Sequence, residues 1–119
     1  MVETERRASS RIRVYRPVRL RQPTGLSLME TLSKDLAEGG VRCLSEIPLP
    51  VATPVVIEVS LSAGELPLEL HGKTAWTRSL PHSEQFEIGI AFLEISPQTK
   101  RRLSGCLDRL SRHPDSISV

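Results

Sequence analysis

The strongest constraint on the fold is an alternation of apolar and polar side chains in the middle of the chain. A period of two is that of a β-strand with one buried face. It predicts three strands, with Glu58, Glu69 and Glu87 on the outward faces. The apolar residues of one parity are Val55, Ile57, Val59 and Leu61, then Leu66, Leu68 and Leu70, then Phe86, Ile88, Ile90 and Phe92.

Weaker alternation predicts three further strands, over residues 14–20, 28–36 and 41–44. The segments between the candidate strands are rich in turn-forming residues, as in "AEGG", "EIPLPVATP", "SAGE" and "LPHSEQ". Short strands in series favour antiparallel pairing, because parallel pairing needs long crossover connections. We therefore expect an all-β domain built on an antiparallel sheet or barrel.

One helix is predicted after the last strand. Ser96 is a suitable N-cap, and Pro97 suits the first turn of a helix. The apolar face of this helix must pack on the sheet, so we interpret Cys106 as a core residue and not as a reactive thiol. That face follows the i, i+3, i+4, i+7 spacing and consists of Leu103, Cys106, Leu107 and Leu110.

Length and composition limit the function classes. A chain of 119 residues is the size of one domain. It contains no apolar leader or membrane-spanning run, so we expect a cytoplasmic location, with both cysteines reduced and no membrane insertion. The two cysteines and three histidines lack the short spacings of zinc sites, so no metal or cofactor is predicted. Neither a nucleophile beside a base nor a carboxylate pair stands out, so an enzyme is not expected.

Positive charge gathers toward the two ends of the chain, although the formal net charge is only +2. Seven arginines lie between Arg6 and Arg21, and five lysines or arginines lie between Lys100 and Arg112. This clustering predicts two local anion-attracting zones rather than a surface that coats nucleic acid. The scarcity of aromatic residues also argues against nucleic acid, because single strands stack on aromatic side chains.

Two motifs suggest the kind of anion. In "RRASSR", residues 6–11, the spacing of Arg7 and Arg11 puts both side chains on the same side of a strand or helix. A guanidinium pairs with phosphate or with the O6/N7 edge of guanine. In "DLAEGG", the carboxylate of Asp35 can accept the N1 and N2 protons of guanine, and Gly40 lets backbone approach a ligand. Together these features indicate that the ligand is an anionic guanine nucleotide. Taken separately, the arginines are typical of a solvated arm, and Asp35 is typical of a turn cap.

The sequence resembles the PilZ domain, the bacterial receptor module for cyclic di-GMP, over nearly its whole ordered length. Four stretches carry the resemblance in order: "RRASSR", "SKDLAEGGVRC" where the family has D/N-x-S-x-x-G, "GKTAWTR" and "FEIGIAFLEIS". The last two are similar to the family's penultimate strand, which carries a tryptophan, and to its final strand. The resemblance implies a six-stranded antiparallel β-barrel with a C-terminal helix packed on it. Trp76 is interpreted as a core or barrel-rim residue.

The resemblance also implies a set of ligand-binding residues. Arg7 and Arg11 match the arginine pair that clamps phosphate and guanine, and Arg6 is expected to assist them. Asp35 and Gly40 match the first and last positions of the second motif. The ligand implied is cyclic di-GMP.

Ala37 departs from the family pattern, which usually has serine at this position. Loss of one hydroxyl should weaken binding by about 0.5–1.5 kcal/mol, or by about 1–3 kcal/mol if its partner is left dry and unpaired. The leading hypothesis is therefore a cytoplasmic second-messenger receptor whose arginine arm closes over cyclic di-GMP and changes a surface bound by an unidentified partner protein. The alternative is an adaptor of the same fold that has lost nucleotide binding.

These hypotheses divide the chain into three parts. We expect residues 1–13 to form a flexible arginine-rich arm, residues 14–112 to form the PilZ-like barrel with its helix, and residues 113–119 to form a disordered tail.

Overall fold

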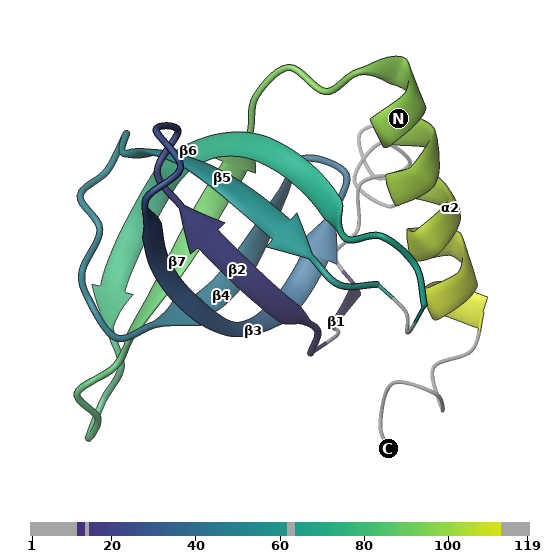
Figure 1. Ribbon diagram of the computed structural model, residues 1–119. Helices are drawn as coiled ribbons and strands as arrows, with labels where there is room; N and C mark the ends of the chain where they lie inside the picture. Colours follow the sequence, from purple (N-terminus) through teal and green to yellow (C-terminus); the bar gives the residue numbers. More distant parts are fainter. Residues whose placement is uncertain (1–11, 14, 62–63, 113–119) are drawn as a thin grey trace, which may run out of the picture.

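The computed structural model describes residues 12–13, 15–61 and 64–112, and Figure 1 shows the arrangement of its elements. The predicted arm and tail thus lie almost wholly outside the described residues, and their boundaries stay predictions. The elements in the described part are β1 (Ile12–Arg13), β2 (Pro17–Arg21), β3 (Ser27–Ala37), β4 (Gly40–Ser45), β5 (Pro54–Val59), β6 (Leu68–Ser79), β7 (Phe86–Phe92) and α2 (Pro97–Arg112).

Strands β2 to β7 close into an antiparallel barrel. Their order is β3-β2-β5-β6-β7-β4, and β4 pairs back with β3. Every pairing in this ring is antiparallel. The short β1 pairs with the same edge of β3 as β2 does, but further along that strand. Ile12 lies opposite Leu36, and Pro17 lies opposite Leu32. A six-stranded antiparallel barrel with a C-terminal helix confirms the predicted fold class.

The core fills the inside of the barrel, and the predicted inward parity of β5 and β7 is confirmed by the burial of residues such as Ile57 and Ile88. The prediction for Leu66 is wrong, because this side chain is 80% exposed and precedes β6. Pro67 has no backbone N–H to donate to a ladder, so pairing begins at Leu68. From there β6 runs on through the tryptophan segment to Ser79.

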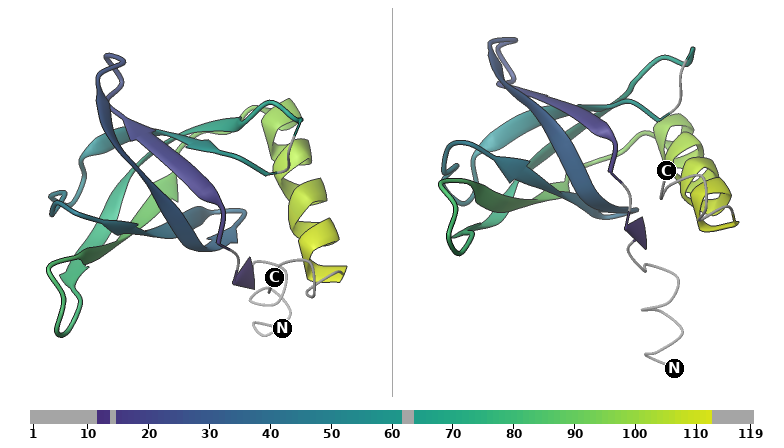
Figure 2. Two further views of the ribbon diagram at one scale, coloured as in Figure 1. Left: turned by 60° about the horizontal axis from the view of Figure 1, so that its bottom comes forward. Right: turned by 90° about the horizontal axis from the view of Figure 1, so that it is seen from below.

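Helix α2 lies against one end of the barrel, as Figures 1 and 2 show from different sides, and it contacts β6 and β1. Its predicted N-cap is confirmed, since the Ser96 Oγ accepts a hydrogen bond from the Thr99 backbone N–H at 3.1 Å. Leu103, Cys106 and Leu107 join the barrel core, as the helical spacing predicted. None of the described helical residues forms a span long and apolar enough to cross a membrane.

Both cysteines are buried with free thiols. Burial, with a smaller effect from the nearby Asp35 carboxylate, raises the pKa of Cys43 to about 12. Burial also raises the pKa of Cys106 above its ordinary value. The thiolate is the reactive form of cysteine, so both side chains are inert core residues at neutral pH.

Candidate functional site

The motif "DLAEGG" forms the hairpin that joins β3 to β4. Ala37 pairs with Gly40 across a two-residue turn, and Asp35 pairs with Arg42 two positions further on. Alternation along the strands puts these four residues on the outer face of the barrel, whereas Leu36 between them belongs to the core. We call this surface the hairpin face.

The structure therefore brings three of the predicted site residues together, namely Asp35, Ala37 and Gly40. The other three, Arg6, Arg7 and Arg11, lie outside the described residues.

Asp35 is almost completely buried on the hairpin face. It lies within β3 rather than in the turn, and its Oδ2 forms an ion pair with Arg42 Nη2 at 2.5 Å. The register of β3 against β4 shifts between Ser33 and Asp35, which is the signature of a β-bulge at Lys34. A bulge turns two consecutive side chains toward the same side of a strand, so the side chains of Lys34 and Asp35 can both lie on the hairpin face.

Glu87 on β7 is the centre of a charged cluster on this face. The sequence predicted an outward side chain, but the side chain is 0% exposed because cations cover it. Arg78 donates two hydrogen bonds to Glu87 Oε1, at 2.9 Å from Nε and 2.6 Å from Nη2. Lys34 Nζ lies 2.8 Å from Oε2, and Arg42 Nε lies 3.9 Å from the same oxygen.

The surroundings of Glu87 favour its ionised form. Burial by itself raises the pKa of this carboxyl, but the contacts with Lys34 and Arg78, helped by the charge of Arg42, outweigh burial and lower the pKa below the ordinary value of 4.5. The cluster sets three cationic side chains, Lys34, Arg42 and Arg78, against the carboxylates of Asp35 and Glu87, so by formal charge it carries one net positive charge, which suits an anionic ligand.

The indole ring of Trp76 lies next to this cluster. It is half-buried and sits across from Gly89, where an added Cβ would come within 2.3 Å of the ring atoms. The Arg78 guanidinium lies over the ring, 5.7 Å from its centroid, in a cation–π contact. Trp76 is therefore a packed residue of the barrel wall, in agreement with its interpretation as a core or rim residue.

Gly40 is required by the barrel itself. A Cβ at this position would lie 2.4 Å from the backbone oxygen of Ile90 on β7, a distance that real Cβ atoms do not reach. Next to it, the turn is tied to the helix, because Ser104 Oγ donates a hydrogen bond to Glu38 Oε2 at 2.9 Å. The hairpin turn is thus packed against β7 and hydrogen-bonded to α2.

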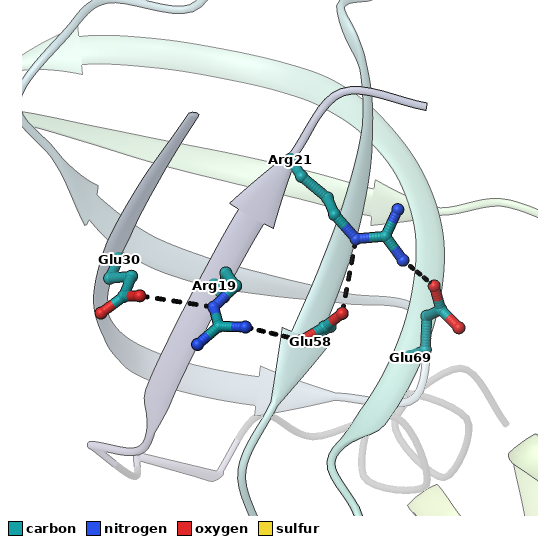
Figure 3. Close-up of polar contacts among 5 residues, drawn as sticks. All are labelled: Arg19, Arg21, Glu30, Glu58 and Glu69. Atoms are coloured by element: carbon teal, nitrogen blue, oxygen red, sulfur yellow. Dashed lines mark hydrogen bonds and ion pairs between the residues drawn. The ribbon is translucent and has the colours of Figure 1, made fainter. Parts of the chain in front are cut away.

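The opposite wall of the barrel takes up part of the N-terminal arginine run. Arg19 pairs with Glu30 at 3.4 Å and with Glu58 at 3.7 Å. Arg21 pairs with Glu58 at 3.4 Å and also with Glu69, as Figure 3 shows. Three carboxylates against two guanidinium groups give this set of five side chains one net negative formal charge. Arg19 and Arg21 are paired with carboxylates of the barrel strands. Of the N-terminal arginines that were predicted to attract an anion, we therefore keep only those before β2 as candidates.

Sequence reasoning missed Arg42 and Glu87. The pairing of Asp35 with Arg42 could have been found, since a two-residue turn between Ala37 and Gly40 sets the register of the hairpin as far as Asp35. Glu87 offered no such local signal, because its neighbours come from three other strands. The described residues contain no group of His, Cys, Asp and Glu that could hold a metal ion.

These features define a small closed β-barrel domain with a charged outer face. The chain matches the family model of the PilZ domain over residues 5–109, and it therefore belongs to the PilZ domain family. This result confirms the resemblance seen in the sequence. No match was found among curated protein sequences.

Solved structures show the same fold at low sequence identity. The PilZ domain of YcgR from Escherichia coli, solved with c-di-GMP, is 19% identical with a TM-score of 0.71, over 96% of this chain and 99% of that chain. Bacillus subtilis MotI, an inhibitor of motility, is 18% identical with a TM-score of 0.72, over 90% of this chain and 52% of that chain. The MrkH–c-di-GMP complex of K. pneumonia is 17% identical with a TM-score of 0.72, over 91% of this chain and 53% of that chain. The chain thus spans about half the length of MotI and MrkH.

Proposed function

We propose that this PilZ domain is a cyclic di-GMP receptor or adaptor that works by binding and not by catalysis. The observation that carries the proposal is that Asp35, Ala37 and Gly40 share one outer face, directly beside the point where the N-terminal arm joins the barrel. Their arrangement supplies a carboxylate that can accept the N1–H and N2–H donors of guanine, within a cluster that is positive overall.

The position of the arm follows from the register of β1. Ile12 lies opposite Leu36, and Arg13 lies opposite Asp35. Arg11 is bonded to Ile12, so its Cα lies about 3.8 Å from that of Ile12, and four more residues of extended chain span at most about 14 Å. Both arginines of the R-x-x-x-R motif can therefore reach a ligand on the hairpin face. Closure of the arm over the nucleotide would create the surface that a partner protein binds.

Relatives support the choice of ligand. Structures of the YcgR PilZ domain and of MrkH contain c-di-GMP, and the present chain has the aspartate and glycine of the family's second motif together with the arginine pair of the first. We extend this ligand to the present chain as part of the proposal. The two free thiols fit a reducing compartment, so we place the domain in the cytoplasm.

Ala37 favours a second candidate function. Its side chain is 4% exposed, and it stands where the family usually carries a serine hydroxyl. An adaptor that has lost nucleotide binding would keep the fold and bind its partner equally well with and without nucleotide.

Isothermal titration calorimetry with cyclic di-GMP, GMP and GTP tests the first proposal. We expect saturable binding of cyclic di-GMP that is tighter than that of either mononucleotide. Asp35→Asn should weaken it by about tenfold or more, the value of a charged hydrogen bond, whereas Glu30→Gln, at the other end of β3 and paired with Arg19, should leave it unchanged. An absence of heat at high micromolar cyclic di-GMP would overturn the receptor proposal and leave the adaptor.

A further inference from the structure

Arg42 holds the carboxylate that the proposed ligand would need. Its Nη2 lies 2.5 Å from Asp35 Oδ2, and the two residues are direct partners across the hairpin. A guanidinium offers a carboxylate neighbouring N–H donors, and the N1–H and N2–H edge of guanine offers the same type of donor pair. Arg42 and guanine therefore offer Asp35 the same type of N–H donors, from a cation in the first case and from a neutral base in the second.

Arg42 also has a second acceptor within reach. Its Nε is buried and has no hydrogen-bond partner in the described part of the chain, and it lies 3.9 Å from Glu87 Oε2. A carboxylate oxygen has two lone pairs, so Oε2 can accept from Arg42 as well as from Lys34. A shift of about 1 Å would bring Nε to hydrogen-bonding distance. Glu87 itself is anchored by Arg78, so it provides a fixed second position.

From these two positions we propose that Arg42 is an intramolecular competitor of guanine at Asp35. In the free domain it occupies Asp35, and when guanine binds, the guanidinium moves toward Glu87 and keeps its charge paired. The inference rests on the proposed cyclic di-GMP binding and adds the residue that sets its affinity and its base selectivity. Adenine lacks the N1–H and N2–H donors, so it cannot take the place of Arg42.

The competitor role predicts a change in affinity opposite in sign to the one that electrostatics alone would give. Removal of a cation from an anion-binding face normally weakens binding by electrostatics, but removal of Arg42 should strengthen the binding of cyclic di-GMP. The decisive variant is Arg42→Gln, which keeps a polar side chain of similar length without the guanidinium. Its matched control is Arg19→Gln, which removes the same charge from a strand on the opposite wall.

We would titrate wild type, Arg42→Gln, Arg19→Gln, Asp35→Asn and the double variant Asp35→Asn/Arg42→Gln with cyclic di-GMP and with cyclic di-AMP. Arg42→Gln is expected to bind cyclic di-GMP about tenfold more tightly, the effect of one charged hydrogen bond released from competition. It should gain nothing for cyclic di-AMP, and the gain should vanish in the Asp35→Asn background. Arg42→Lys keeps a cation but lacks the planar set of N–H donors of the guanidinium, so it should give a smaller gain in affinity. It also serves as a second variant in case Arg42→Gln does not fold.

The outcomes separate this inference from the proposed function. If wild type binds cyclic di-GMP and Arg42→Gln binds it equally or less tightly, the competitor role is wrong and the receptor function stands. If neither protein binds, both are wrong. Binding by Arg42→Gln alone would support the competitor role in its strongest form. An equal gain for both dinucleotides, or a gain that persists with Asp35→Asn, would also overturn it, because the effect would then not pass through the guanine edge.

Discussion

The most demanding test of the charged cluster is the substitution Glu87→Gln, which removes one negative charge and almost no volume. The side chain is 0% exposed, and it receives two hydrogen bonds from Arg78 and an ion pair from Lys34. A glutamine keeps one acceptor for Arg78 but turns an amide group toward the remaining cations. The cluster then has three positive charges and only Asp35 to balance them.

The magnitude follows from the exposure of the partners. Breaking a fully buried ion pair costs about 3–5 kcal/mol, but Lys34 and Arg78 are 32% and 63% exposed and can be rehydrated. We therefore expect a loss of about 2–4 kcal/mol, built from one or two charged hydrogen bonds. With a urea slope of about 1.5 kcal/mol/M, the unfolding midpoint should fall by about 1–3 M.

The assay is urea unfolding at several pH values, with Glu30→Gln as the control. The Glu30 side chain is 73% exposed and pairs with Arg19 at 3.4 Å, so its loss should cost about 0–1 kcal/mol. The pKa of Glu87 is lowered from 4.5 in the folded state, so its contribution is complete well above pH 4.5 and is lost as the pH falls through the folded pKa. Equal losses for the two variants at pH 7, or a Glu87→Gln effect that persists unchanged at low pH, would refute the reasoning.

Three further predictions concern packing and binding. Gly89→Ala should destabilise the domain by about 1–3 kcal/mol, because the new Cβ would lie 2.3 Å from the tryptophan ring. Its control is Gly105→Ala, which adds a methyl group in open space on the helix and should stabilise the domain by about 0.5–1 kcal/mol. If thermal unfolding shows no difference between the two variants, the tryptophan ring moves aside freely. Arg7→Ala and Arg11→Ala should each weaken cyclic di-GMP binding by about tenfold to hundredfold in calorimetry, and small equal losses would indicate diffuse attraction instead. Ala37→Ser should tighten binding by about 1 kcal/mol with an unchanged circular dichroism spectrum, and no gain would favour the adaptor without nucleotide.

Much of the fold could be predicted from the sequence because its signals are local. The alternation around Ile57 and Ile88 has the period of a strand whatever lies beside it, and the cap at Ser96 needs only the residues that follow it. The same holds for the hairpin of "DLAEGG", whose turn residues determine which positions of β3 and β4 face each other. The error at Leu66 arose because a parity argument alone ignored the missing N–H of the next residue, Pro67.

The candidate site was predictable only in part. Asp35, Ala37 and Gly40 were predicted as ligand-binding residues because they belong to one continuous motif, and the structure places them on one hairpin. Arg42 lies on the same hairpin, but its significance depends on Glu87, which is 45 residues away along the chain and comes close only through the pairing of β4 with β7.

The sequence by itself therefore determined which segments become strands, where the helix begins and which motif marks the hairpin face. Only the tertiary structure decided that the outward Glu87 is buried, that a bulge at Lys34 adds a cation to its cluster, and that Arg42 lies between two carboxylates. The physical reason is that strand formation depends on neighbours a few residues apart. The pairing of charges across a closed barrel depends instead on the register of several strands at once, and a one-residue slip in any of them would turn these side chains to the other face.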